Sequence, residues 1–145
     1  MFEAALVCLA LNVYHEARGQ PFIGQVAVAQ VVMNRVDDPR YPDTVCEVVE
    51  QGPTYSWTDD FPVRHRCQFS WYCDGKSDNV PEVDVEAWDM ARLAAFGTYF
   101  GRVENNVGDS LWYHADYVTP GWASHKSETA IIGNHIFYEW KNGTQ

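Results

Sequence analysis

Apolar residues recur with helical spacing along most of the chain. The stretch 3–17 is apolar on nearly every side and runs into Gly19, which is typical of a buried helix with a left-handed stop. A second apolar stretch covers 23–36, and a helix with a clear 3.6-residue period begins at a capping Asp84 and reaches about Tyr99. The pattern therefore predicts three long helices.

Shorter elements follow from local turn signals. Thr44 and Glu47 form a capping-box pattern, which predicts a short helix to about residue 51. Residues 111–115 indicate a short strand, and 129–140 indicate a hairpin that turns at Gly133-Asn134. We therefore expect an α+β fold that is mostly helical, with a small antiparallel β-sheet.

The stretch 52–81 has no hydrophobic period and is dense in Gly, Pro, Asp and aromatic residues. A loop of this length stays ordered in a domain when it is functional or cross-linked. Aromatic rings interleaved with polar side chains suit stacking on sugar faces, so we expect one wall of a cleft here. The alternative is a satellite core beneath the loop. The rings are those of Tyr55, Trp57, Phe61, Phe69, Trp71 and Tyr72.

Glu16 is the main candidate for chemistry within the first helix. Cys8, Asn12 and Glu16 repeat every four residues and so share one face of that helix. A carboxyl group at the inner end of an apolar helix is desolvated, which raises its pKa toward the value that a general acid needs at neutral pH. The structural alternative is that Glu16 pairs with Arg18 or faces water.

The composition limits the classes of partner. The 145 residues suit one domain, and no repeat, linker or low-complexity segment indicates a second. A formal net charge of -10 repels phosphate backbones and anionic lipids, so we expect no nucleic-acid binding and no membrane insertion. An aromatic share of 14% favours a carbohydrate ligand. We expect the protein to be a monomer.

The four cysteines suit an oxidising compartment and allow three complete pairings. Cys67 and Cys73 bracket a short loop, whereas Cys8 and Cys46 lie on two helices that we expect to pack together. Proximity therefore favours the disulfides Cys67–Cys73 and Cys8–Cys46.

The start of the chain lacks the pattern of an export signal. Its first ten residues are largely apolar, but Glu3 stands in place of a basic region and the stretch runs on into polar residues. We therefore expect either a trimmed catalytic domain or a protein released by other means, as phage lysis proteins are.

Metal chemistry is a weaker candidate. No Cys-x-x-Cys motif is present, and His15-Glu16 lacks the second His of an HExxH site, so we expect no metal and no cofactor. The segment 113–117 reads Tyr-His-Ala-Asp-Tyr, and a strand end would present His114 and Asp116 on one side.

Segments along nearly the whole chain resemble the SleB-type cell wall hydrolases. The first two read CLALNVYHEARG at 8–19 and GQVAVAQVVMNRV at 24–36. The others follow in the family's order. They are Thr44-Val45-Cys46, Cys67-Gln68-Phe69-Ser70-Trp71, Tyr113-His114-Ala115-Asp116-Tyr117-Val118 with Pro120 and Trp122, and Ile132-Gly133 with His135, Phe137 and Tyr138.

The resemblance implies a single cell wall hydrolase catalytic domain over 1–145, with a lysozyme-like, two-lobed fold. It implies that Glu16, the Glu of the family's Tyr-x-Glu-Ala-Arg-Gly motif, is the catalytic acid. His15 and Gln20 depart from the family pattern, where an aromatic and an acidic residue are frequent, so we expect a different local acidity. The candidates for the walls of the substrate cleft are Phe69, Ser70, Trp71, Tyr113, His114, Asp116, Tyr117 and Trp122.

The resemblance also implies an activity: cleavage of the peptidoglycan glycan strand between N-acetylmuramic acid and N-acetylglucosamine, by a lytic transglycosylase or a muramidase acting in the periplasm or outside the cell. No second carboxylate is obvious beside Glu16, which favours a 1,6-anhydro product, with Asp116 as the competing partner for hydrolysis. The charge and the missing export pattern favour a phage endolysin. The alternatives are a peptidoglycan-binding module without catalysis and a Cys/His peptidase of peptide stems that uses Cys67 or Cys73.

Overall fold

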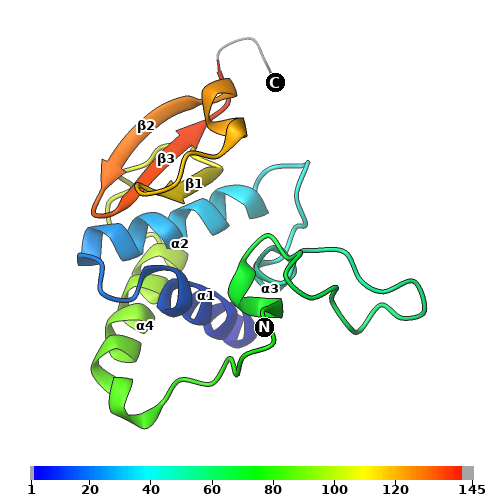
Figure 1. The fold of residues 1–145 in the computed structure, drawn as a ribbon. Helices are drawn as coiled ribbons and strands as arrows, with labels where there is room; N and C mark the ends of the chain where they lie inside the picture. The colour runs from blue at the N-terminus through cyan, green and yellow to red at the C-terminus, as the bar shows by residue number, and fades with distance from the viewer. Residues whose placement is uncertain (1, 142–145) are drawn as a thin grey trace.

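Three long helices build the main body of the protein in the computed structural model, which describes residues 2–141. They are α1 (Phe2–Ala17), α2 (Phe22–Val36) and α4 (Val85–Tyr99), and each begins and ends within one residue of the expected bounds. The three pack against one another, and the short α3 (Val45–Val49) packs against α1 and α2 (Figure 1). The helical part of the fold prediction is confirmed.

The helix ends follow the expected signals with one exception. Gly19 closes α1 with a φ of 85°, and the Thr44 hydroxyl accepts the backbone N–H of Glu47 at 3.3 Å at the start of α3. Asp84 precedes α4 but makes no side-chain cap, so that expectation was wrong. Its Oδ2 instead accepts hydrogen bonds from the Tyr14 hydroxyl and from Arg18, which hold the carboxylate toward α1 and away from the helix N-terminus.

A three-stranded antiparallel sheet forms the second lobe. Its strands are β1 (Trp112–Ala115), β2 (Ser127–Ile132) and β3 (His135–Glu139), in the order β1-β3-β2. The expected hairpin turns between β2 and β3, where Gly133 takes a φ of 57°. The sheet lies over α2, and α1, α3 and α4 lie on the other side of that helix (Figure 1). The α+β class with a small antiparallel sheet is therefore confirmed.

The helix α2 is shared by two hydrophobic cores. Val32 belongs to the larger core among the four α-helices, and Val28 and Val31 belong to a smaller core under the sheet with Phe137. Tyr113 packs against both cores. The junction of the two lobes therefore runs along α2 and past Tyr113.

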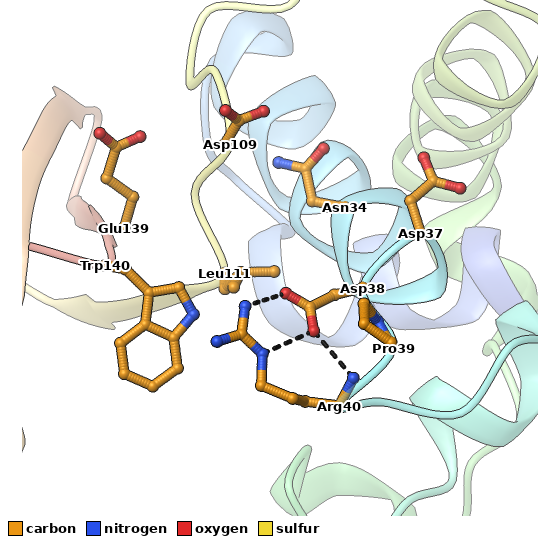
Figure 2. Close-up of a pocket in the computed structure, with 9 residues that line it drawn as sticks. All are labelled: Asn34, Asp37, Asp38, Pro39, Arg40, Asp109, Leu111, Glu139 and Trp140. Atoms are coloured by element: carbon orange, nitrogen blue, oxygen red, sulfur yellow. Dashed lines mark hydrogen bonds and ion pairs between the residues drawn. The ribbon is translucent and has the colours of Figure 1, made fainter. Parts of the chain in front are cut away.

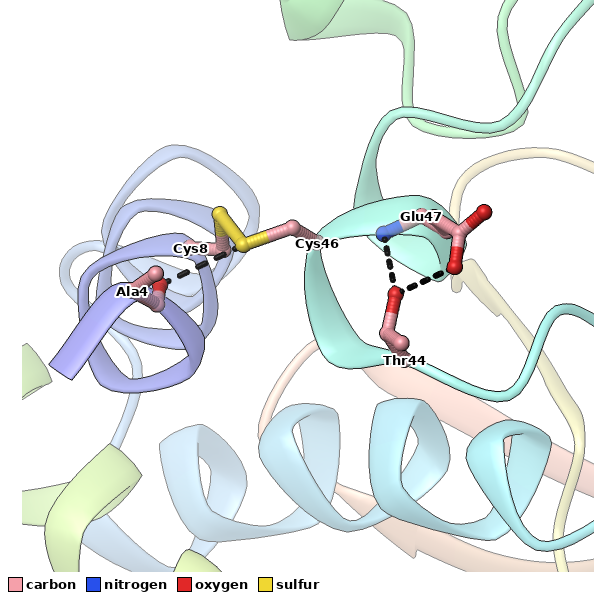
Figure 3. The surroundings of a disulfide bond; sticks show 5 residues. All are labelled: Ala4, Cys8, Thr44, Cys46 and Glu47. Carbon is pink, nitrogen blue, oxygen red and sulfur yellow. Dashed lines mark hydrogen bonds between the residues drawn. A yellow bond between two sulfur atoms is a disulfide. The ribbon is translucent and has the colours of Figure 1, made fainter. Parts of the chain in front are cut away.

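Two disulfides hold the helical lobe, and they are the two pairs that proximity favoured. Cys8–Cys46 joins α1 to α3, with its Cα atoms 5.3 Å apart (Figure 3). Cys67–Cys73 links the end of the long loop after α3 to the last residue of the short 3-10 helix η1 (Ser70–Cys73). No helix within residues 2–141 is long and apolar enough to cross a membrane.

Candidate active site

Glu16 lies in the last turn of α1 and meets β1 at the junction of the lobes. The Tyr113 hydroxyl on β1 donates a hydrogen bond to Oε1 of Glu16. Among residues 2–141, no side chain or backbone group donates a hydrogen bond to Oε2. One carboxyl oxygen is therefore held in place, and the other is available to a bound molecule.

The surroundings of Glu16 favour its protonated form. Burial raises the pKa of the carboxyl group, and the hydrogen bond from Tyr113 and the positive charge of Arg35 partly offset that rise. Arg18, the partner in the structural alternative, instead forms an ion pair with Asp84. No second carboxylate among the described residues acts on the pKa of Glu16.

Arg35 on α2 is a buried cation at this junction. It is 5% exposed, its Nε donates to the backbone oxygen of Leu111 at 2.8 Å, and its guanidinium lies 5.0 Å from the Tyr41 ring and 5.2 Å from the Phe69 ring. One of its terminal nitrogens has no hydrogen-bond partner among the described residues. Because the charge is enclosed by rings and little screened, it stabilises the ionised form of Glu16 from a distance.

Tyr113 is fixed as a hydrogen-bond donor. Burial and the negative charge of Glu16 raise the pKa of its hydroxyl well above 10, so the group keeps its proton. Its ring contacts those of His135 and Phe137 on the adjacent strand β3, with centroids 5.0 Å and 5.5 Å away. This packing sets the direction in which the hydroxyl reaches Glu16.

His135 lies beside the site, although the sequence analysis named it only within a segment that resembles the family and not as a site residue. It is 7% exposed, and burial lowers the pKa of its ring, which is therefore neutral at pH 7. Its Nδ1 has no hydrogen-bond partner among residues 2–141. The signal that could have found it is register, because His135 pairs with Ala115, two residues beyond Tyr113 on the same face of the sheet.

The segment after the long loop is attached to the face of α1 that carries Glu16. Trp71 donates its indole N–H to Oδ1 of the buried Asn12 at 2.8 Å, and the His15 ring stacks on Trp71 with centroids 4.5 Å apart. The Nε2 of His15 lies 3.0 Å from the backbone oxygen of Asp78. His15, at a position where the family often has an aromatic residue, thus acts here as a flat ring on Trp71.

Two of the expected cleft residues have little surface left for a sugar. Phe69 is 3% exposed and Trp71 is 8% exposed, and both belong to the larger core. Ser70, between them, is exposed. In the segment 69–71, the two rings therefore pack in the protein interior, and the Ser70 side chain alone is exposed to solvent.

The expected cluster around β1 is divided between the two faces of the strand. Nε2 of His114 lies 2.8 Å from the hydroxyl oxygen of Tyr138, and the His114 ring packs near Trp122. His114 therefore lies on the face of the sheet opposite to Tyr113. Asp116 follows the end of the strand, is exposed, and raises the pKa of His135. Of the expected residues on this strand, Tyr113 alone contacts Glu16 directly.

A polar cavity of about 750 Å³ lies at the carboxyl end of α2 (Figure 2). It is lined in part by Asp109, Glu139 and Trp140, and the Asp38–Arg40 ion pair lies at its edge. Glu16 does not line it, so the cavity is separate from the candidate site. No group of three or more His, Cys, Asp or Glu residues within 2–141 is placed to hold a metal ion.

The chain is similar to known cell wall hydrolases. The family model described as Cell Wall Hydrolase matches residues 19–138. The chain is 32% identical over 129 residues to a spore cortex-lytic enzyme of Halalkalibacterium halodurans and 35% identical over 130 residues to one of Oceanobacillus iheyensis. Both alignments cover 89% of this chain but 33% and 39% of the relatives, so the chain spans about a third to two fifths of their length.

Two solved structures share the fold. The catalytic domain of a germination-specific lytic transglycosylase, SleB, from Bacillus anthracis superposes with a TM-score of 0.70 at 29% identity over 93% of each chain. The catalytic domain of the Bacillus cereus SleB protein gives a TM-score of 0.69 at 28% identity, over 94% of this chain and 91% of that one. The family match, the curated relatives and the shared fold lead to one conclusion: the chain belongs to the Cell Wall Hydrolase family.

Proposed function

We propose that this chain cleaves the glycan strand of peptidoglycan between N-acetylmuramic acid and N-acetylglucosamine, with Glu16 as the catalytic acid. The observation that carries the proposal is the half-buried Glu16 carboxyl group with a raised pKa, one oxygen held by Tyr113 and the other unoccupied. The names of the relatives, spore cortex-lytic enzyme and lytic transglycosylase, support the same substrate and reaction.

In the first step, Glu16 gives its proton to the glycosidic oxygen as the bond from that oxygen to the anomeric carbon of N-acetylmuramic acid breaks. The N-acetylglucosamine part leaves with a new hydroxyl group, and Glu16 remains as a carboxylate. The positive charge left at the anomeric carbon is shared by the 2-acetamido group of the muramic residue until the next bond forms there. Tyr113 and Arg35 stabilise that carboxylate, because each lowers the pKa of Glu16. The same two groups thus assist the departure of the proton.

In the second step, the Glu16 carboxylate takes the proton of the 6-hydroxyl group of the muramic residue while that oxygen bonds to the anomeric carbon. The products are a 1,6-anhydro end and a protonated Glu16, ready for another cycle. A hydrolytic route needs a second carboxylate at a defined separation from the first. The name lytic transglycosylase, carried by the similar SleB structure from Bacillus anthracis, supports the anhydro route over hydrolysis with Asp116.

We propose that Ser70, Asp116 and Tyr117 contact the substrate, since all three are exposed and lie close in sequence to Trp71 or Tyr113. A peptidase that uses Cys67 or Cys73 is disfavoured, because a disulfide leaves neither sulfur free to act as a thiolate. The two disulfides also suit action at the wall, outside the reducing cytoplasm. Delivery as a phage endolysin remains our proposal on the charge of -10 alone.

The experiment that tests the proposal is digestion of purified peptidoglycan in heavy-oxygen water, followed by mass spectrometry of the released muropeptides. Unlabelled muramic ends that are lighter by one water support the anhydro route. Labelled ends show hydrolysis and replace that route with a muramidase reaction. New amino groups without new glycan ends refute glycan cleavage altogether.

A further inference from the structure

A cluster of exposed rings lies outside the site, on the loop that follows α3. Tyr55, Trp57 and Phe61, which we call the aromatic tip, are 41%, 72% and 57% exposed. The rings of Tyr55 and Trp57 are nearly parallel with centroids 6.1 Å apart, and Phe61 lies 5.7 Å from Trp57. The loop extends away from the body of helices (Figure 1), and the tip rings pack on one another outside both cores.

The aromatic tip is held in a defined shape. An antiparallel bridge joins Thr54 to Pro62, and the Tyr55 N–H donates to the Phe61 backbone oxygen at 3.2 Å. At the base of the loop, the Gln68 N–H donates to the Gln51 backbone oxygen at 2.9 Å. Large apolar rings are stabilised when they leave water. A loop that holds such rings exposed in a preformed arrangement is therefore typical of a binding surface.

We propose that the aromatic tip is a second binding surface for the glycan strand of peptidoglycan, separate from the catalytic cleft. The inference rests on the proposed function. Flat rings stack on the C–H faces of sugars, and the exposed carboxylates of Asp59 and Asp60 supply acceptors for sugar hydroxyl groups. The same two negative charges repel anionic lipids and phosphate backbones, so the charge favours a sugar polymer over a membrane or a nucleic acid.

The tip is joined in sequence to the segment that packs beside the candidate active site. The loop returns through Cys67 to η1, whose Trp71 binds Asn12 and stacks on His15, the neighbour of Glu16. A glycan strand held at the tip therefore stays attached to the protein between cleavage events. On an insoluble polymer with many equivalent bonds, such a second contact raises the local concentration of substrate at the cleft.

The test is cosedimentation of the Glu16→Gln protein, which cannot digest its ligand, with purified insoluble peptidoglycan sacculi. Adding Trp57→Ala should weaken binding about fivefold, the scale of one lost ring contact. Trp57→Phe should retain most of the binding, because it keeps a flat ring. The matched control is Phe96→Ala on α4, which removes a ring that is 52% exposed and should leave binding unchanged.

Binding that is unchanged in Trp57→Ala, or lowered equally by Phe96→Ala, overturns the proposal. Trp57-dependent binding to vesicles of phosphatidylglycerol and phosphatidylcholine, in place of sacculi, also overturns it. Circular dichroism verifies that each variant is folded. If Trp57→Ala is not, Tyr55→Ala decides the matter, because it removes the ring that stacks on Trp57 and should weaken binding in the same way. Release of muropeptides from the same sacculi by the wild-type protein tests the proposed function separately. If the wild type digests the sacculi but binding does not depend on Trp57, the proposed role of the aromatic tip is refuted and the proposed function is not.

Discussion

The Tyr113 hydroxyl donates its hydrogen bond to Oε1 of Glu16 across the junction of the helical lobe and the sheet. The two residues are 97 positions apart in the chain. Their contact places the proposed acid at the boundary of the lobes, so the relative position of the lobes determines the chemistry of the carboxyl group.

Glu16→Gln should lower the rate of glycan cleavage by about two to four orders of magnitude while the protein stays folded, because the amide keeps the shape and has no acidic proton to give. Release of muropeptides from purified walls measures the rate, and circular dichroism verifies the fold. A folded Gln variant with normal activity would refute the role of Glu16.

Tyr113→Phe should shift the alkaline limb of the pH profile of kcat/KM to higher pH. The tyrosine hydrogen bond lowers the pKa of Glu16, so its removal raises that pKa and keeps the acid protonated to higher pH. The maximal rate should fall at the same time, since the carboxylate left after proton transfer loses a donor. An unchanged profile would mean that a different group limits the alkaline side.

The raised pKa of Glu16 also predicts how stability depends on pH. The folded protein holds this proton more tightly than the unfolded chain, so the contribution is present at low pH and is lost as pH rises through the folded pKa. Glu16→Gln removes this dependence, and its midpoint of thermal unfolding relative to that of the wild type should increase from pH 4 to pH 8. A difference in unfolding midpoint between the two proteins that stays constant over that range would contradict a raised pKa of the buried Glu16 carboxyl group.

The two disulfides should differ in their contributions to stability. They close loops with sequence separations of 38 and 6, so chain entropy predicts losses of about 4 kcal/mol for Cys8→Ala with Cys46→Ala and about 2 kcal/mol for Cys67→Ala with Cys73→Ala. Urea unfolding of the two double variants measures both. The reverse order would show that native packing, and not loop closure, dominates.

His114→Ala should cost stability with little effect on catalysis. His114 contacts the Tyr138 hydroxyl on the face of the sheet opposite to Tyr113. Its removal leaves that hydroxyl without this hydrogen-bond partner, whereas the hydrogen bond between Tyr113 and Glu16 is retained. The unfolding midpoint should fall, and kcat/KM should stay within about threefold of the wild type, well below the effect of a lost general acid. A loss comparable to that of Glu16→Gln would place His114 in the chemistry.

The secondary structure was accessible from the sequence because its signals are local. The apolar period of α1, its stop at Gly19 and the turn at Gly133-Asn134 each act within a few residues. Asp84 shows the limit of such reasoning, because its carboxylate had a helix N-terminus nearby in sequence but Tyr14 and Arg18 nearby in space. A local signal fails where a distant partner binds the same group more strongly.

The sequence by itself determined the helices, the hairpin and the choice of Glu16 as the candidate acid, since patterning and a family motif carry that information. Only the tertiary structure decided which neighbours reach Glu16. Strand alternation turned Tyr113 toward it and His114 away, and packing in the larger core buried Phe69 and Trp71. These outcomes depend on how the lobes dock across α2, and docking depends on contacts between residues that no local pattern connects.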